Sequence, residues 1–309
     1  MKLYYYSGTA PNFGDDLNTW LWPQIMPEVI ADGDAGELFL GIGSILSNKV
    51  PQAANKYVLG TGFGGYSPKP EVDDSWKFYF VRGPNTAAAL GLDPALAITD
   101  AAILLRSVDA ILEPAEKRFP VSFMPHWESA IYGAWKDVAE MAGVHLIDPR
   151  GTPEQVLEEL KATELLVTEA MHGAIVGDAL RVPWIPILPT SATHRFKWLD
   201  WCASLSIDYQ PQTLGVSSVN EFVKLKGFDP FYPAELVKRV TGRYGGGADH
   251  FLKRNAAKRL RAIARMKPTL SSDSQCEMRT TQAVEKLEAL RSDFRLGKGA
   301  KIPELAGRS

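Results

Sequence analysis

The chain has 309 residues, of which 45% are hydrophobic and 23% are charged, and its formal net charge is -2. This length predicts about two compact units, each with its own buried core. Because the net charge is close to neutral, the overall electrostatic field does not favour nucleic-acid binding, and any basic site must be local. Only Cys202 and Cys276 are present, which excludes a disulfide framework or a cysteine-rich metal site and indicates a reducing compartment.

The N-terminal segment predicts a short buried strand over residues 2–6, a polar loop from Asn12 to Asn18 and then an apolar helix. Its short apolar run is not the core of a signal peptide. No stretch of the chain approaches the roughly 18 apolar residues that a membrane-spanning helix needs. We therefore expect a cytoplasmic protein.

Strands and helices alternate through the rest of the first half. Pro84 suits the first turn of a helix that directly follows a buried strand. The charged, proline-flanked segment 112–120 is a predicted linker, so residues 1–112 form an expected N-terminal α/β lobe. The predicted strands of this half are 38–42, 57–59 and 78–81, and Ile98 to Asp100 closes it.

The second half repeats this alternation, and we expect a C-terminal α/β lobe over residues 120–232. Alternation of this kind predicts parallel sheets with helices on both faces. Two such lobes that face each other across a cleft would resemble the two-lobed glycosyltransferase architecture called GT-B. The predicted strands are 121–124, 145–147, 165–167 and 184–188, and the predicted helices are 153–161 and 171–180.

Residues 233–309 form a predicted basic helical extension that begins with a flexible glycine break at 244–247. On a helical wheel four cations of this extension, Arg254, Lys258, Arg261 and Arg265, fall on one face. This face is either a solvated surface of a packed helix or a contact, through 251–266, with anionic lipid headgroups or with a lipid-linked pyrophosphate acceptor.

A glycine-rich run at 60–65 matches a dinucleotide-binding pattern on paper, but Pro68 and Pro70 prevent the helix that such a pattern requires. We interpret the run as a tight loop with positive backbone angles. The chain has no phosphate-loop lysine, and its five histidines show no close metal-ligand pairing. The sequence therefore predicts neither a metal nor a bound cofactor.

The strongest candidate for catalysis is His172, which follows a buried strand and lies at the mouth of a helix. Ligands of parallel sheets bind at this edge, and helix amides such as that of Gly173 attract an anion there. Glu169 is expected to orient the imidazole or keep it protonated. His172 is thus a candidate proton donor beside a bound anion, although a helix-capping or buried structural histidine would fit the same position.

Three cations are candidates for binding that anion. Arg82 directly follows the strand at 78–81, and Arg195 and Lys197 follow the strand at 184–188. An arginine over its own strand, or an ordinary solvated helix start, would account for the same residues.

Two polar groups are candidates for binding sugar hydroxyls. Asn12, Asp15, Asp16 and Asn18 lie on the first loop between a strand and a helix, where helix capping would also explain at least one of them. His126 ends a predicted strand beside the aromatic ring of Trp127, and it is our second choice as an acid or base.

Six segments, in this order and spacing, resemble the polysaccharide pyruvyltransferase family over about residues 1–220. The resemblance is closest to the exopolysaccharide ketal pyruvyltransferases of the succinoglycan and xanthan type. The segments are Asn12–Asn18, Gly41–Ser44, Gly60–Gly62, Val81–Pro84, Thr99–Asp100 and Met171–Ala174.

This resemblance implies a GT-B-like fold, phosphoenolpyruvate as the donor, His172 as the acid and Arg82 as a donor-binding residue. Many members carry an arginine two residues before the histidine, where this chain has Ala170. We expect Arg195 and Lys197 to supply the missing charge. Replacing Arg82 with alanine is then expected to weaken mainly the binding of the donor.

The predicted reaction moves the pyruvyl group of phosphoenolpyruvate onto a sugar of an exopolysaccharide repeat unit, forms a pyruvate ketal and releases phosphate. The acceptor is expected to be a lipid-linked oligosaccharide, with the enzyme peripheral on the inner membrane. A glycosyltransferase that uses a nucleotide sugar and a non-catalytic glycan-binding assembly subunit are the alternatives.

Overall fold

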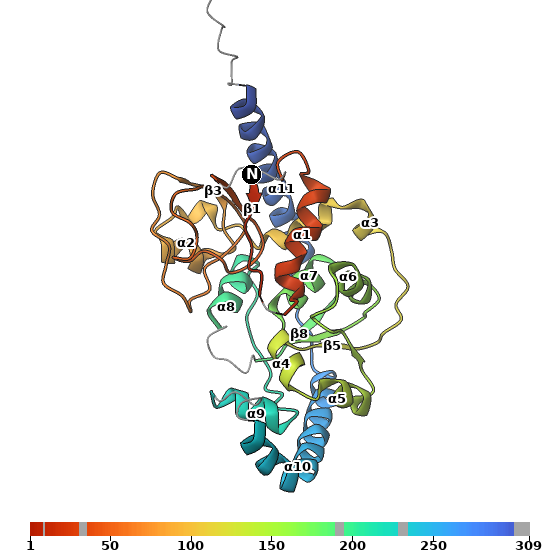
Figure 1. Cartoon of the computed structure of the whole chain (residues 1–309). Coiled ribbons are helices and arrows are strands. Elements are labelled where there is room, and N and C mark those ends of the chain that lie inside the picture. Colours follow the sequence, from red (N-terminus) through yellow and green to blue (C-terminus); the bar gives the residue numbers. More distant parts are fainter. Residues whose placement is uncertain (9, 31–35, 189–194, 228–233, 300–309) are drawn as a thin grey trace, which may run out of the picture.

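The computed structural model describes residues 1–8, 10–30, 36–188, 195–227 and 234–299, with the backbone alone at 234–246 and 296–299. The protein has two four-stranded sheets, both entirely parallel, and β1 and β3 of the first lie above β5 and β8 of the second in the view of Figure 1. The first has the order β1-β2-β3-β4 and the second the order β6-β5-β7-β8. Their strands are β1 (Lys2–Leu3), β2 (Glu37–Leu40), β3 (Asn55–Leu59), β4 (Trp76–Phe80), β5 (Ser122–Met124), β6 (His145–Leu146), β7 (Leu166–Thr168) and β8 (Trp184–Pro186).

Helices connect the strands of the second sheet and lie between β1 and β2, whereas irregular loops join β2 to β3 and β3 to β4. The chain then ends in two long helices. The α-helices are α1 (Phe13–Ile25), α2 (Pro84–Leu90), α3 (Asp109–Leu112), α4 (Trp127–Tyr132), α5 (Trp135–Ala142), α6 (Pro153–Lys161), α7 (Met171–Ala179), α8 (Arg195–Ser204), α9 (Val219–Leu225), α10 (Ala234–Ile263) and α11 (Asp273–Gly299), and the 3-10 helices are η1 (Pro94–Leu96) and η2 (Ala101–Ser107).

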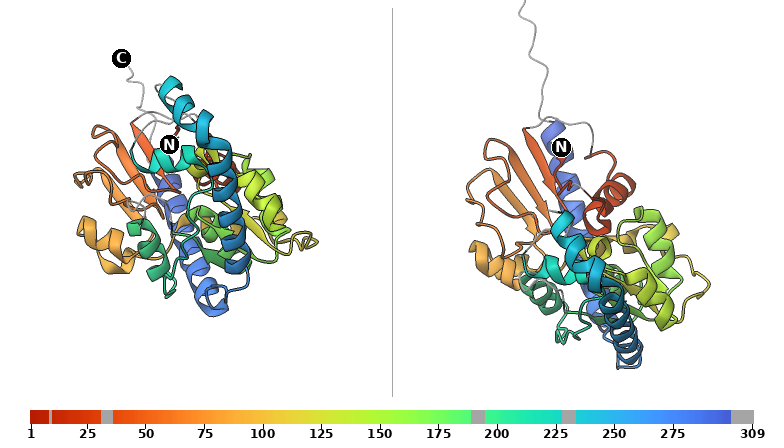
Figure 2. Two further views of the ribbon diagram at one scale, coloured as in Figure 1. Left: turned by 90° about the horizontal axis from the view of Figure 1, so that it is seen from below. Right: turned by 60° about the horizontal axis from the view of Figure 1, so that its bottom comes forward.

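The two halves of the chain share one hydrophobic core. Helix α1 packs beside α6 and α7 of the second half, and α8 packs on α2 of the first half. Figure 2 shows α1 standing beside the second half and α11 running along the molecule. Buried side chains from both halves, such as Trp22 of α1 and Val176 of α7, therefore belong to one cluster, which α11 completes with Leu287.

The mixed α/β class and the parallel sheets predicted from the alternation are confirmed. Helix α6 coincides with its prediction, because Thr152 and Gln155 form a reciprocal capping box before a well-defined apolar face. The predicted domain boundaries stay a prediction. The two halves that carry the sheets share one hydrophobic core, so they pack directly against each other.

Two local predictions are wrong. Most of the predicted polar loop at 12–18 lies inside α1, which begins at Phe13. The predicted glycine break at 244–247 lies within α10, since packing of Leu260 and other downstream side chains outweighs a glycine cost of about 1 kcal/mol per residue.

The glycine-rich run is a loop, as predicted. Gly60 and Gly65 have positive φ angles of 87° and 80°. A Cβ atom on Gly62 would lie 2.3 Å from Cζ of Arg82, so glycine at this position lets the arginine cross the backbone. None of the helices that the structure describes is long and apolar enough to cross a membrane.

Candidate active site

The carboxyl ends of the two sheets meet at a cavity of about 780 Å³. Parallel sheets bind ligands at this edge, because strand ends and helix starts bring polar groups together there. The first half contributes the segments after β1 and β2, and the second half contributes the segments after β5 and β7. The lining residues that matter below are Asn12, Asp15, Ser44, Lys49, Tyr66, His126, Trp127, Glu128, His172 and Lys197.

His172 is the second residue of α7, so its imidazole stands at the helix mouth that the sequence predicted. The side chain is 14% exposed and lines the cavity. A Cβ atom on Gly14 would lie 2.1 Å from its Nδ1, so only glycine at the start of α1 leaves room for the ring. The imidazole is therefore held between the two halves of the chain.

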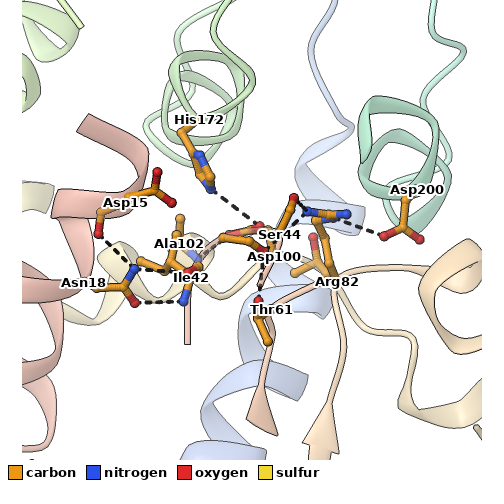
Figure 3. A network of polar contacts seen from close by, with 12 residues as sticks. Asp15, Asn18, Ile42, Ser44, Thr61, Arg82, Asp100, Ala102, His172 and Asp200 are labelled. Atoms are coloured by element: carbon orange, nitrogen blue, oxygen red, sulfur yellow. Dashed lines mark hydrogen bonds and ion pairs between the residues drawn. The ribbon is translucent and has the colours of Figure 1, made fainter. Parts of the chain in front are cut away.

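Asp100 faces the other ring nitrogen. Its Oδ2 lies 3.8 Å from Nε2 of His172, and both atoms are buried without a hydrogen-bond partner (Figure 3). Its Oδ1 accepts a hydrogen bond of 3.0 Å from Ala102 N and so caps η2. A fully buried carboxylate at this distance is the natural counter-charge of a protonated imidazole.

Two predicted residues of the His172 segment are placed differently from what the sequence led us to expect. Glu169 is buried, and its Oε2 accepts a hydrogen bond of 3.0 Å from the backbone N of His126. Gly173 packs inside the second half, because a Cβ there would meet Sδ of Met124 at 2.7 Å. Neither residue lines the cavity.

The start of α1 carries the predicted sugar-binding group. Asp15 and Asn12 line the cavity, and Nδ2 of Asn12 donates a hydrogen bond of 2.5 Å to Oδ2 of Asp15. Asp16 does not line it, because its Oδ2 accepts from the backbone N of Asn12 and caps the helix. Burial raises the pKa of Asp15, which His172 and the bond from Asn12 oppose.

Asn18, one turn later, fixes α1 to the end of β2. It donates to the carbonyl oxygen of Ile42 at 3.0 Å and accepts from the N of the same residue at 2.9 Å. Its Oδ1 also accepts a hydrogen bond of 2.8 Å from Nε1 of Trp22. These bonds pair every polar group of a buried amide and set where Asp15 projects into the cavity.

Lys197 is the predicted cation that reaches the cavity. Burial, followed by the neighbouring Arg82 guanidinium, lowers the pKa of Lys197 to about 8. The carboxylates of Asp15, Glu128 and Glu169 oppose this shift. A lysine whose ammonium form is destabilised by burial would gain from a bound anion, because the anion would replace the water that burial removed.

Arg82 is fully buried and does not line the cavity. Its Nε donates to Oδ2 of Asp200 at 3.0 Å, and its Nη2 donates to the carbonyl oxygen of Phe63 at 2.7 Å. Its Nη1 donates to Oγ of Ser44 at 2.6 Å, and Ser44 lines the cavity. Arg82 thus lies outside the cavity, and its hydrogen bond fixes the side chain of Ser44 in the cavity lining (Figure 3).

Two further predicted residues differ in whether they line the cavity. His126 lines the cavity, with Nδ1 at 3.7 Å from Oε2 of Glu128. Arg195, at the exposed start of α8, does not line it. The neighbouring His194 lies outside the described residues.

The sequence interpretation gave no role to Asp100, which faces His172 without lining the cavity, or to the cavity residues Lys49 and Tyr66. Asp100 had a readable signal, since it lies in the Thr99–Asp100 segment that carries part of the family resemblance. Lys49 and Tyr66 had none, because they come from irregular loops of the first half. Among the described residues, no group of three or more His, Cys, Asp or Glu side chains could hold a metal ion.

Comparison with known proteins identifies the family of this chain. The family model described as polysaccharide pyruvyl transferase matches residues 20–191, which include η2, Asp100 and His172. The chain belongs to the polysaccharide pyruvyl transferase family. It is also 40% identical over 224 residues to the succinoglycan biosynthesis protein ExoV of Rhizobium meliloti (strain 1021). The aligned region covers 71% of this chain and 69% of that protein.

The chain is therefore a polysaccharide pyruvyltransferase, and the likeness to ExoV associates it with exopolysaccharide modification by pyruvyl transfer. No solved structure matches it significantly. The arrangement around His172 consequently rests on the geometry of this pyruvyltransferase itself.

Proposed function

We propose that this pyruvyltransferase takes the pyruvyl group from phosphoenolpyruvate and places it on two hydroxyls of one sugar of an exopolysaccharide repeat unit. The product is a cyclic ketal, and inorganic phosphate leaves. The observation that carries the proposal is His172, which lines the cavity at the meeting edge of the two sheets and faces the buried Asp100. We also propose that the two sheets correspond to the two lobes of a GT-B-like enzyme.

Phosphoenolpyruvate carries a carboxylate and a phosphate, so its site must present several positive or hydrogen-bond-donating groups. Lys197 and Lys49 are the lysines of the cavity lining, and Ser44 adds a hydroxyl that Arg82 holds. We assign donor binding to these groups. Arg82 then acts on the donor through Ser44, while the exposed Arg195 has no contact with the cavity that would support the role predicted for it.

His172 then donates a proton to the methylene carbon of phosphoenolpyruvate. The neighbouring carbon becomes electron-deficient, and a first sugar hydroxyl adds to it with loss of its proton. A second hydroxyl displaces the phosphate and closes the ketal. The two hydroxyls release two protons, of which one restores His172 and one leaves with the phosphate, so the reaction balances without a further reactant.

Asp100 is proposed to hold the protonated imidazole in position. Because Nε2 is enclosed and faces Asp100, we infer that Nδ1 delivers the proton. Asp15 and His126 are proposed to bind the acceptor hydroxyls, since both line the same cavity as His172. Trp127 offers an aromatic face next to them, and a second cavity of about 240 Å³ continues past Glu128 along α4 and α9.

The acceptor is proposed to be a lipid-linked oligosaccharide, and the enzyme is proposed to work in the cytoplasm as a peripheral protein of the inner membrane. The exposed cations of α10 support this position. No prosthetic group is proposed, and phosphoenolpyruvate is a co-substrate.

The function is tested by incubating the protein with phosphoenolpyruvate and exopolysaccharide repeat-unit oligosaccharides, free or lipid-linked. We expect phosphate release together with a pyruvyl mass increment on the glycan. Nucleotide release from a nucleotide sugar would instead identify a glycosyltransferase. Tight glycan binding without turnover would identify an assembly subunit.

Lys197 predicts a pH dependence of donor binding. Its ammonium form attracts the donor anion, so affinity should be highest below its pKa of about 8 and fall as the pH rises through this value. Lys197→Ala should raise KM for phosphoenolpyruvate about 10- to 100-fold, the cost of one lost hydrogen bond to a charged group. Lys197→Arg should stay charged and lose the fall in affinity between pH 7 and about 9.

Steady-state kinetics from pH 6.5 to 9.5 measure this effect. Arg195→Ala is the matched control, because it removes a cation of the same helix outside the cavity. An unchanged KM in Lys197→Ala would contradict the assignment. An equal rise in Arg195→Ala would do the same.

A further inference from the structure

The C-terminal part of α10 and the segment after it hold an unusual concentration of positive charge. Between His250 and Ser272 the sequence has seven lysines and arginines and no aspartate or glutamate. The whole chain has a formal net charge of -2. This segment is therefore a local basic region on a protein that is otherwise slightly acidic.

Helix α10 has two different faces. One face buries Ala256, Ala257, Leu260 and Ile263 in a core shared with Trp135 and other residues of α5. Of the other side chains described between residues 247 and 263, Asp249, Leu252 and Lys253 are half-buried and the rest are exposed. The cations here called the α10 basic face are Arg254, Lys258 and Arg261 of α10 and Arg265 of the turn after it, all of them exposed; Arg259 is exposed as well.

The α10 basic face borders a groove of about 730 Å³. His250, Arg254, Lys258 and Arg261 line the groove, and Met141 of α5 contributes its edge. Among the described residues, Lys253 of this segment forms an ion pair with Asp137 at 2.8 Å. Arg254, Lys258 and Arg261 form no ion pair with a described carboxylate. The positive charges of the groove are thus available to an external anion.

Apolar side chains stand beside these cations. Phe251 is 65% exposed, Met266 is 43% exposed and Met141 is 39% exposed. A helix face that contacts only water gains nothing from a phenyl ring exposed to this extent. Cations flanked by exposed apolar side chains match a surface that presents phosphates above hydrocarbon.

We propose that the α10 basic face, with Phe251 and Met266, docks this enzyme on an anionic lipid bilayer. The cations contact lipid phosphates, and the phenyl ring enters the boundary between headgroups and acyl chains. Figure 1 shows α10 at one end of the molecule, away from the first sheet, so a bilayer could cover it without covering that sheet. This inference deepens the peripheral membrane position proposed above, and because its test needs no turnover, its failure would leave the proposed pyruvyl transfer untouched.

The test is co-sedimentation of the full chain with vesicles of phosphatidylcholine alone and of phosphatidylcholine with phosphatidylglycerol. We expect binding to the anionic vesicles that weakens between 50 and 500 mM salt, because salt screens exposed charges. Each lysine or arginine near such a surface strengthens binding about fivefold, so the triple variant Arg254→Glu, Lys258→Glu and Arg261→Glu should lose at least about 100-fold. Phe251→Ser should weaken the binding that persists at high salt.

The matched control is the triple variant Lys2→Glu, Lys69→Glu and Arg118→Glu, which makes the same change of net charge at exposed residues of other parts of the fold. It should bind anionic vesicles within about threefold of the parent chain, with the loss due to net charge alone. Circular dichroism and pyruvyl transfer to a soluble oligosaccharide check that both triple variants fold.

Three results would overturn the proposal. One is equal binding, or no binding, to the two kinds of vesicle. Another is an equal loss in the control variant. The third is competition for the groove. Loss of vesicle binding in 10 mM inorganic phosphate would make the groove a site for a free anion, and preferential binding of an RNA homopolymer over vesicles would also exclude the bilayer as its partner.

Discussion

Replacing His172 with alanine is expected to lower kcat about 10²- to 10⁴-fold, the usual cost of removing a positioned acid. The imidazole stands at the mouth of α7 and lines the cavity in which the donor is proposed to bind. Donor affinity should change much less, because Lys197 and Ser44 remain. The measurement is single-turnover phosphate release together with equilibrium binding of phosphoenolpyruvate.

His172→Gln tests whether the acid itself is needed, since glutamine retains a polar side chain of similar size without a transferable proton. We expect it to be as slow as the alanine variant. Turnover near that of the parent enzyme in either variant would exclude His172 as the proton donor. His145 is the matched control, because its imidazole pairs with Glu159 away from the cavity and His145→Ala should keep kcat.

Asp100→Asn belongs to the same prediction, because Asp100 is proposed to act through His172. Asparagine keeps the oxygen that accepts from Ala102 N and caps η2, but it removes the counter-charge 3.8 Å from Nε2. We expect kcat to fall about 100-fold, as for a small misplacement of a reacting group, with little change in the KM for phosphoenolpyruvate.

A double-mutant cycle separates positioning from a general structural effect. In the His172→Ala background, Asp100→Asn should cost almost nothing further, since the imidazole that it positions is gone. If Asp100→Asn lowered kcat equally in both backgrounds, the carboxylate would act independently of His172. The ¹⁵N shifts of labelled His172 offer a second readout, because loss of Asp100 should change which ring nitrogen carries the proton.

Arg82→Ala is expected to destabilise the fold by about 3–5 kcal/mol, because it leaves a buried carboxylate without its cation. Asp200 is fully buried, and besides Arg82 it accepts hydrogen bonds from the N and Oγ1 of Thr86 at 2.9 and 2.6 Å. The pair joins α8 to the start of α2. This expectation differs from the sequence-based one, in which the variant mainly weakens donor binding.

Denaturant unfolding of the apo-enzyme measures the effect without any substrate. The double variant Arg82→Met and Asp200→Leu should recover part of the lost stability, since apolar side chains of similar volume remove both charges together. Arg195→Ala, an exposed change in the same helix as Asp200, should stay within about 0.5 kcal/mol of the parent chain. An Arg82→Ala enzyme with the parent stability and a raised KM would support direct donor binding instead.

Much of the fold could be predicted because its signals are local. The capping box of Thr152 with Gln155, the proline at the start of α2 and the short buried strands all depend on residues close in sequence. The glycines at 245–247 led to a wrong prediction, because a local propensity of about 1 kcal/mol per residue is small beside the packing of a whole helix.

The sequence by itself determined that a histidine follows a buried strand of a parallel sheet and stands at the start of a helix. The strand, the turn and the helix start all lie between Leu166 and Gly173, so their signals are local. Only the tertiary structure decided which groups surround that histidine. Asp100 faces it because the carboxyl edges of two sheets meet. Lys197 lines the cavity while Arg82 is enclosed, because α8 packs on α2 and brings Asp200 to a partner 118 positions away. The direction of a side chain and the identity of its counter-charge depend on such long-range packing, and no local pattern contains them.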